Sequence, residues 1–368
     1  MTNPEKSYRI GVLCTNFSPV GGAERQAARL LEQEISAGRR PIAIALIPPS
    51  ESEPEPVFPD IRRLSNSKSR LSQIESWRIL RKICRDEKLD ALITFTIPAN
   101  FMGRLIYGWG LKTRIITSFR TSKVPKARQI FLRLTRSREH VANFNSEESR
   151  AAFAKLGLID ERKSGVIANA LPPVLPERIP FLTKDLDHGR TWLFAGRLIT
   201  AKGLEPLLDA WAIYIKSRPE DKLLIAGEGP LLSDLQAQVT SLQIENSVQF
   251  LGFIKNFTDL WPKVHFAILS SRWEGSPNFL LEAAVIGAPF VSTRVPGVRG
   301  LLPTSVNPDD FTVPIEDAPA LAQAMLRLAN QTPEALETLS QGLRERVEAT
   351  NSHAAVMEAW ANLITGAR

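Results

Sequence analysis

Two glutamates lie eight positions apart in the segment 271–283 of this 368-residue sequence. Glu274 comes shortly after the apolar run 267–269, and Glu282 follows inside a stretch of helical pattern. A carboxylate can accept two hydrogen bonds from vicinal hydroxyls, so both residues suit the recognition of a sugar or a ribose. On spacing alone, solvated surface charges at both positions are an equally good interpretation.

The residues between the two glutamates predict the start of a helix. Ser276 is a good N-cap, and Pro277 fits the first helical position. The amides of Asn278 and Phe279 would then point back toward the end of the preceding strand, which is a ready site for an anion. The segment therefore predicts an anion site beside two carboxylates.

A second segment, 194–203, places two cations after another apolar run. Arg197 and Lys202 lie in the loop that would follow this strand. Two cations in such a loop can clamp a diphosphate and stabilise the charge that develops when it leaves. Taken singly, either residue is more often a solvated surface charge.

A third segment follows the first strand and contains Gly21 and Gly22 at the start of a helical pattern. Glycine lets the backbone approach a ligand closely, and a helix N-terminus favours anions. The segment is neither a GxGxxG fingerprint nor a Walker motif. A lone glycine pair is usually only a turn.

All three segments lie in an alternation of apolar runs and helical patterns that predicts an α/β fold with parallel sheets. In the first half, we expect strands at 10–14, 42–47, 90–96, 115–119 and 141–144 and helices at 23–37, 72–88 and 146–156. In the second half, we expect strands at 192–195, 223–226, 248–251, 267–270 and 290–293 and helices at 204–215, 277–286, 319–331, 333–349 and 352–364. Open parallel sheets bind ligands beyond the carboxyl ends of their strands, where the polar segments lie.

The residues 171–190 hold four prolines and no clear period, which is typical of a domain boundary. We expect one Rossmann-like domain over 1–175 and a second over 190–350. The terminal helix, 352–368, is expected to pack back on the first domain. Two such sheets would face each other across a cleft.

Together these residues resemble the family-4 (group 1) retaining glycosyltransferases, which have the two-domain GT-B fold. The resemblance covers nearly the whole chain and is strongest from 192 to 297. It rests on the ordered motifs Gly21-Gly22-Ala23-Glu24-Arg25, Val166-Ile167-Ala168-Asn169, Gly196-Arg197-Leu198 with Lys202-Gly203, Gly227-Glu228-Gly229-Pro230, and Glu274 to Glu282 with Gly275, Pro277, Leu281 and Ala283 between and beside them.

The resemblance implies an enzyme that moves a sugar from a nucleotide-diphosphate-sugar to a glycan or lipid-linked acceptor, in cell-surface polysaccharide or lipopolysaccharide assembly. It implies that Arg197 and Lys202 bind the donor diphosphate, that Glu274 contacts the transferred sugar, and that Glu282 holds the ribose. The other residues that it places at the donor are Gly21, Gly22, Gly196, Glu228, Gly275, Ser276, Pro277, Asn278, Phe279 and Leu280. The second domain would bind the donor and the first the acceptor.

The sequence departs from the family pattern at three positions. Many relatives have histidine where Arg120 stands, and the Ser118-Phe119-Arg120 segment resembles a subset with arginine there. Arg120 can polarise or orient a group at the reaction centre but cannot act as a base. Gly300 replaces a usual glutamate, and Ala170 replaces a common glycine.

Neither the four histidines nor the acidic residues show the spacing of a metal site. We therefore expect catalysis without a metal or other cofactor, with Arg197 and Lys202 supplying the positive charge. The resemblance implies a front-face retaining reaction in which the donor phosphate takes the acceptor proton. The two cysteines, Cys14 and Cys84, indicate no disulfide framework and favour a reducing, cytoplasmic location.

Charge is distributed unevenly along the chain. Residues 1–180 carry 30 Lys and Arg against 18 Asp and Glu, whereas residues 181–368 carry 16 against 21. Seven of the basic residues lie between 120 and 140 with a single acid, and they alternate with Ile130, Phe131, Leu132 and Leu134. This pattern suits a helix at an anionic bilayer, although a solvated helix packed by its apolar face fits as well.

We expect no signal peptide and no membrane span, so the protein would be peripheral on the cytoplasmic face of the inner membrane. Two other classes of function stay open. An epimerase-like sugar-nucleotide enzyme of the same fold should need histidines and acid–base carboxylates, and this chain has few histidines. A non-enzymatic anion- or nucleic-acid-binding protein should show a groove-reading helix or an aromatic platform, and neither is evident, so no nucleic acid partner is expected.

Overall fold

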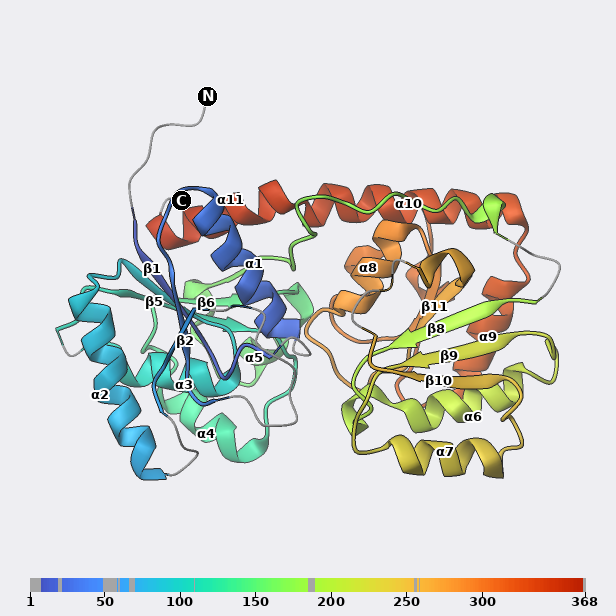
Figure 1. Ribbon diagram of the computed structural model, residues 1–368, viewed down its shortest axis with the longest axis horizontal. Helices are drawn as coiled ribbons and strands as arrows, with labels where there is room; N and C mark the ends of the chain where they lie inside the picture. Colours follow the sequence, from blue (N-terminus) through green and yellow to red (C-terminus); the bar gives the residue numbers. More distant parts are fainter. Residues whose placement is uncertain are drawn as a thin grey trace. The chain divides into compact units, whose positions relative to one another are not determined.

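The computed structural model describes residues 8–18, 22–48, 58, 60–65, 70–108, 110–184, 189–254, 257 and 259–366. The chain forms two compact units, the first Met1–Pro172 with His353–Arg368 and the second Pro173–Ser352. Each unit is an α/β domain with a parallel sheet (Figure 1).

The sheet of the first unit has seven parallel strands in the order β3-β2-β1-β4-β5-β6-β7. The strands are β1 Ile10–Cys14, β2 Ile42–Ala45, β3 Ile61–Arg63, β4 Ala91–Thr94, β5 Arg114–Phe119, β6 Val141–Phe144 and β7 Ser164–Val166. The helices are α1 Gly22–Ser36, α2 Arg70–Asp86, α3 Ile97–Ile106, α4 Lys126–Leu134, α5 Glu147–Lys155 and α11 His353–Thr365. The chain leaves β1 for β2 on one side and returns to β4 on the other, so the strand order reverses between β1 and β4.

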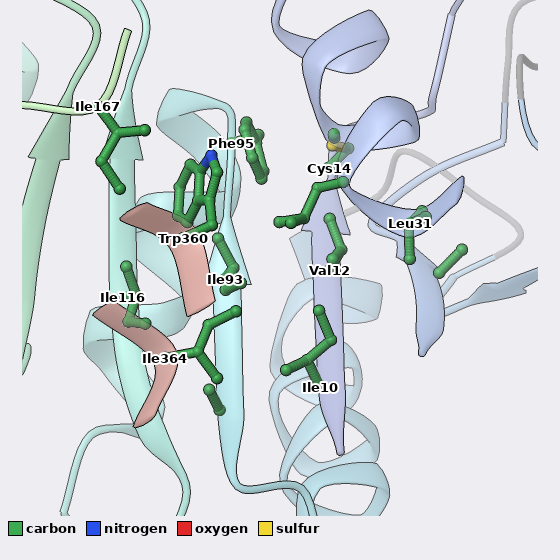
Figure 2. Close-up of a cluster of buried hydrophobic side chains, with 14 of the residues drawn as sticks. Ile10, Val12, Cys14, Leu31, Ile93, Phe95, Ile116, Ile167, Trp360 and Ile364 are labelled. Atoms are coloured by element: carbon green, nitrogen blue, oxygen red, sulfur yellow. The ribbon is translucent and has the colours of Figure 1, made fainter. Parts of the chain in front are cut away.

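Alternation along β1 divides the core of this unit between the two faces of the sheet. Ile10, Val12 and Cys14 pack in one cluster, and Leu13 packs in another, because successive side chains of a strand point to opposite faces. The first cluster also contains side chains from α1 and from the terminal helix α11, including Trp360 (Figure 2). The last helix of the chain is thus part of the core of the first unit.

The sheet of the second unit has six parallel strands in the order β10-β9-β8-β11-β12-β13. The strands are β8 Thr191–Ala195, β9 Lys222–Ala226, β10 Val248–Gly252, β11 Phe266–Leu269, β12 Phe290–Thr293 and β13 Thr312–Val313. The helices are α6 Leu204–Tyr214, α7 Leu232–Ser241, α8 Asn278–Ile286, α9 Ala318–Ala329 and α10 Pro333–Asn351. Here the strand order reverses between β8 and β11.

Most expected elements are confirmed within one to three residues at each end, and their caps explain where several begin. Ser146 accepts from the amide of Ser149 at the start of α5, and Asp317 accepts from Ala320 at the start of α9. The helices α3 and α7 and the short strands β3, β7 and β13 were not predicted. The helix α3 begins at Ile97, two residues beyond the buried Phe95, so only the N-cap residue Thr96 separates the apolar residues of the strand from those of the helix.

Candidate functional site

The loop after β8 lies beside the loop after β9, joined by backbone hydrogen bonds. The amide of Gly196 donates to the carbonyl of Ala226 at 3.0 Å, and the amide of Leu198 donates to the carbonyl of Glu228 at 2.8 Å. Gly227 has φ +143°, and a Cβ there would lie 1.9 Å from the carbonyl oxygen of Gly196. Only glycine allows this approach, so Gly227 fixes the separation of the two loops.

The loop after β8 is also packed against the end of β11. Gly203 has φ +58°, and a Cβ there would lie 2.3 Å from the carbonyl oxygen of Ser270. The Ser270 hydroxyl donates to the carbonyl of Lys202 at 3.0 Å, and the amide of Arg272 donates to the carbonyl of Ala201 at 2.9 Å. These contacts place the loops of β8 and β11 together where the strand order reverses, which is where open α/β sheets bind ligands.

Lys202 and Glu274 form an ion pair at this position. Lys202 Nζ lies 2.5 Å from Glu274 Oε1, and the two side chains are 21% and 14% exposed. The Ser271 hydroxyl donates to the same Oε1 at 2.8 Å. In the part of the chain that the structure describes, Glu274 Oε2 has no partner, so it is available to accept a hydrogen bond from a ligand.

The sequence placed Lys202 at a diphosphate and Glu274 at sugar hydroxyls but did not predict that they pair. The ion pair spans 72 positions of sequence, and no local pattern indicates it. Lys202 also lies across Gly196, where a Cβ would approach its Cε to 3.4 Å. Gly196 therefore leaves room for the lysine side chain to reach the carboxylate.

Arg197 and Glu228 lie at the exposed rim of the same loops. The Arg197 side chain makes no hydrogen bond or ion pair with any residue that the structure describes, and only its carbonyl is used, by the amide of Ile199 at 3.0 Å. An exposed guanidinium without a counter-charge can bind an anionic ligand without first breaking a contact.

The helix α8 begins one residue later than expected. Pro277, with ψ 106°, occupies the N-cap position and makes no side-chain cap, so the prediction of Ser276 as N-cap and Pro277 as first helical residue is wrong. The extended backbone of the proline delays the first helical bond, which runs from the amide of Leu281 to the carbonyl of Pro277 at 3.1 Å. The first turn is then Asn278, Phe279 and Leu280.

The residues around this helix start are held closely. Gly275 and Pro277 are buried, and Ser276 is half-buried. A Cβ on Gly297, which has φ +83°, would lie 2.8 Å from Cα of Ser276, so the loop after β12 packs directly on the helix start. Glu282 is half-buried and is the fifth residue of α8, just over one turn from its start rather than two.

Arg272 fixes the β11 loop to its neighbours, a role that the sequence did not predict. Its guanidinium donates to the carbonyl of Thr200 at 2.6 Å, to Glu205 at 3.2 Å and to Glu316 at 2.7 Å. It thereby connects the β8 loop and the first turn of α6 to the loop that carries Glu274. The motif itself gave no signal for these partners, because they lie far away in sequence.

In the first unit, Arg120 follows β5 at the carboxyl edge of the sheet. Nε donates to the Ser118 hydroxyl at 2.9 Å, and Nη1 donates to Asn169 Oδ1 at 2.9 Å and to the carbonyl of Ile167 at 3.3 Å. The guanidinium carbon lies 5.2 Å from the ring of Phe95 and 5.6 Å from that of Trp360. Burial lowers the pKa of Arg120 from its ordinary value to about 9.

Gly22 is the first residue of α1, and Gly21 lies outside the described residues. Ala170, which replaces a common glycine, is buried and is held by the side chain of Gln26, whose Oε1 accepts from the Ala170 amide at 2.9 Å. A Cβ on Gly300 would meet nothing within 4 Å, so this position has room for a larger residue.

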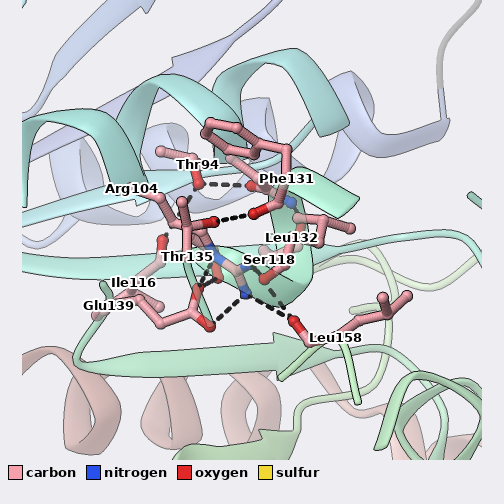
Figure 3. A network of polar contacts seen from close by, with 11 residues as sticks. Thr94, Arg104, Ile116, Ser118, Phe131, Leu132, Thr135, Glu139 and Leu158 are labelled. Atoms are coloured by element: carbon pink, nitrogen blue, oxygen red, sulfur yellow. Dashed lines mark hydrogen bonds and ion pairs between the residues drawn. The ribbon is translucent and has the colours of Figure 1, made fainter. Parts of the chain in front are cut away.

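Beneath Arg120, a buried polar network connects β5 with α3 and α4 (Figure 3). Arg104 and Glu139, which are 0% and 1% exposed, form an ion pair at 2.5 Å. Arg104 also donates to the carbonyl of Leu132 at 3.0 Å, and Glu139 accepts from the hydroxyl of Thr117. The network fixes α4 against the sheet on its buried side.

The basic segment 120–140 contains the expected helix, α4, but only part of the segment faces solvent. Arg120 is half-buried and donates to Ser118 and Asn169, and Arg138 donates to the carbonyls of Arg104 and Tyr107 at 3.1 Å each. These two of the seven cations therefore do not belong to an exposed basic surface. Lys123, Lys126, Arg128, Arg133 and Arg136 are exposed.

The apolar residues of α4 also divide into two groups. Leu132 is buried, and Phe131 packs against Phe101 with ring centroids 4.6 Å apart. Ile130 and Leu134 are 61% and 78% exposed. The helix thus presents two uncovered aliphatic side chains and three of the five exposed cations, and Lys123 and Arg136 flank it.

The described residues contain no group of three or more His, Cys, Asp or Glu that could hold a metal ion. Among the same residues, no helix combines the length and the apolar character needed to cross a bilayer.

Solved structures define the class to which this architecture belongs. HepE from Anabaena, crystallised with UDP and glucose, matches 97% of this chain and 99% of its own with a TM-score of 0.77 and 18% identity. At this identity the match shows the fold, which is that of the two-domain GT-B glycosyltransferases.

The sequence match is more specific. Residues 189–331, which lie in the second unit, match the family model of glycosyl transferases group 1.

Two curated proteins show how far the similarity extends. A Campylobacter jejuni α-1,4-N-acetyl-D-galactosaminyltransferase, whose name specifies an undecaprenol-linked acceptor, is 27% identical over 80% of this chain and 79% of its own. The alpha-monoglucosyldiacylglycerol synthase of Streptococcus pneumoniae is 31% identical over 47% of this chain and 40% of its own. The chain spans only 17%, 29% and 40% of the lengths of the first curated relatives that it matches.

Proposed function

We propose that this protein is a retaining glycosyltransferase that moves a sugar from a nucleoside-diphosphate-sugar to a glycan or lipid-linked acceptor. The observation that carries the proposal is the Lys202–Glu274 pair beside Arg197, at the point where the order of the β8 and β11 strands reverses. The proposed site combines two kinds of group. Its cations can bind a diphosphate, and its carboxylate can bind sugar hydroxyls. The match of residues 189–331 to the group 1 glycosyl transferase model and the UDP complex of HepE support this interpretation.

In the proposed reaction, the bond between the anomeric carbon and the donor phosphate breaks, and a bond to the acceptor oxygen forms on the same face. The leaving phosphate takes the acceptor proton. Arg197 and Lys202 stabilise the charge that develops on the diphosphate. Glu274 Oε2 accepts from a hydroxyl of the transferred sugar, while Oε1 stays with Lys202 and Ser271. We propose that this chemistry needs no metal ion.

The remaining donor contacts follow from the position of α8. Its first turn directs backbone amides toward the end of β11, where a phosphate gains from the helix dipole. Glu282, one turn further on, is placed to accept from the ribose hydroxyls. The relatives suggest the acceptor: their names specify a lipid-linked glycan, a diacylglycerol glycolipid and, for a Salmonella typhi relative, Vi polysaccharide biosynthesis.

A panel of UDP-, GDP- and ADP-sugars tests the function. We expect release of nucleoside diphosphate from at least one donor, persisting in excess chelator. Arg197→Ala should lower turnover about 100-fold or more without loss of stability, because the side chain is exposed and makes no hydrogen bond or ion pair with a described residue. Normal turnover in this variant would contradict the site, and a chelator-sensitive reaction restored by Mg²⁺ or Mn²⁺ would contradict metal independence.

We also propose that α4 holds the protein at the cytoplasmic face of an anionic inner membrane, close to a lipid-linked acceptor. Each cation near such a surface contributes about 1 kcal/mol at physiological salt, and five exposed cations surround Ile130 and Leu134. Leu156, 43% exposed, extends this surface, because Arg133 donates to its carbonyl at 3.0 Å.

Co-sedimentation with vesicles tests this surface. The triple variant Arg128→Gln, Arg133→Gln and Arg136→Gln should lose binding to anionic vesicles and keep donor hydrolysis. The matched control removes the same charge from exposed residues of the second unit, with Lys216→Gln, Lys263→Gln and Arg327→Gln, and should bind as the wild type does. Equal binding to neutral and anionic vesicles, or preferential capture of oligonucleotides, would refute membrane docking.

A further inference from the structure

Arg120 has hydrogen-bonding capacity that the first unit does not use. Of its five N–H donors, Nε is used by Ser118, and the two on Nη1 are used by Asn169 and Ile167. The two donors on Nη2 meet no acceptor among the residues that the structure describes.

No carboxylate in the described part of the chain pairs with this guanidinium. Its guanidinium lies against the rings of Phe95 and Trp360, which also pack on each other, and burial lowers its pKa to about 9. Arg120 is half-buried, and a partly desolvated guanidinium without a counter-charge is unfavourable. A ligand that supplies the counter-charge would remove this cost.

Arg104 provides a contrast within the same unit. It is fully buried, whereas Arg120 is half-buried, but Glu139 neutralises it, and carbonyl oxygens accept its remaining donors. Such a fully paired arginine has a structural role. Arg120, by contrast, donates to the protein through Nε and Nη1, and its Nη2 is available to a ligand.

The position of Arg120 agrees with a ligand site. It follows β5 at the carboxyl edge of the sheet, where the hydroxyls of Thr15 and Thr96, at the ends of β1 and β4, bond to each other at 2.8 Å. Both threonines are half-buried, so this edge offers hydroxyls as well as a cation. A sugar that carries an acidic group has the complementary chemistry.

We propose that Arg120 binds a carboxylate or phosphate of the acceptor, whose oxygen accepts from the two Nη2 donors. This inference rests on the proposed function, in which the first unit takes the acceptor. It predicts that the acceptor is acidic, either as a uronic acid or as a phosphorylated sugar.

Calorimetric titration of the full chain with three probes tests the proposal. Glucuronate and glucose 6-phosphate distinguish the two sources of charge, and glucose is the neutral reference. At least one anionic probe should bind at least 10-fold more tightly than glucose, and Arg120→Gln should abolish the preference. Lys112→Gln, which removes an exposed charge from the same unit, should leave it unchanged.

Arg120→Lys tests whether the effect of Arg120→Gln comes only from misfolding. It keeps the positive charge while losing the forked contacts to Ser118 and Asn169. It should keep part of the preference for the anionic probe, which a merely structural role would not predict. Equal binding of all three probes by the wild type would overturn the proposal. The proposal would also fail if Arg120→Gln lowered the affinity for nucleoside diphosphate and left probe binding intact. If the wild type bound the anionic probe but turned over no sugar donor, the proposed function would be contradicted and the role of Arg120 as an anion site would stand.

Discussion

Lys202 and Glu274 allow the candidate site to be tested without any ligand. Lys202→Met removes the charged partner of Glu274 Oε1 and leaves the Ser271 hydroxyl as its remaining bond. Glu274→Ala removes the carboxylate, and the double variant removes both. A double-mutant cycle on the free energy of unfolding then isolates the interaction between the two residues.

The size of the coupling follows from geometry and burial. A hydrogen bond between charged groups contributes about 1.5–3 kcal/mol, whereas an exposed ion pair contributes about 0–1 kcal/mol. The Lys202–Glu274 contact is short, at 2.5 Å, but its side chains are 21% and 14% exposed rather than fully buried. We therefore expect a coupling of about 1–2 kcal/mol, between these two ranges.

Urea unfolding followed by the fluorescence of the buried Trp192 and Trp211 reports on the second unit. The control cycle uses Arg294→Met and Asp309→Ala, whose ion pair at 3.1 Å has side chains 49% and 55% exposed. It should give less than about 0.5 kcal/mol. A Lys202–Glu274 coupling no larger than the control would show that the pair does not form, and the arrangement of the site would be wrong.

Three further predictions concern stability. Gly227→Ala should lower the free energy of unfolding by at least about 2 kcal/mol and abolish donor turnover, because a Cβ would lie 1.9 Å from the Gly196 carbonyl; wild-type turnover would refute the packing of the two loops. Arg104→Met should destabilise the first unit by about 3–5 kcal/mol in urea titrations, because it leaves Glu139 buried and unpaired; a change below about 1 kcal/mol would refute this. Burial lowers the pKa of Lys184 from 10.5 to about 8 in the folded protein. Between these two pH values, Lys184 holds more protons in the unfolded chain than in the folded protein, so its contribution makes the free energy of unfolding rise with pH. Melting curves of the wild type minus those of Lys184→Met should show this rise from pH 8 to 10, and a flat or falling difference would contradict it.

The sequence predicted the elements that present the site because the signals there are local. Apolar strands, the helix after Pro277 and the loops with Arg197 and Lys202 can all be recognised from neighbouring residues. The start of α8 was misplaced by one residue because the extended backbone of Pro277 determines it, not the side chain of Ser276.

The contacts that assemble the site were not predictable in the same way. Lys202 meets Glu274 across 72 positions, and Arg272 meets Glu316 across 44. No periodicity reports such pairs, because they depend on how separate loops pack. For the same reason the sequence did not show which of the seven cations between 120 and 140 bind groups of the protein, as Arg120 and Arg138 do.

The central claim is that the carboxyl ends of β8 and β11 bind the diphosphate of a sugar donor. Calorimetric titration of the full chain with UDP, GDP and ADP measures this most directly, with Lys216→Gln as a control of equal charge change in the same unit. At least one nucleoside diphosphate should bind, with an affinity that Arg197→Ala lowers at least 10-fold and Lys216→Gln leaves unchanged. If none of the three binds, or if Arg197→Ala binds as tightly as the wild type, the claim is contradicted.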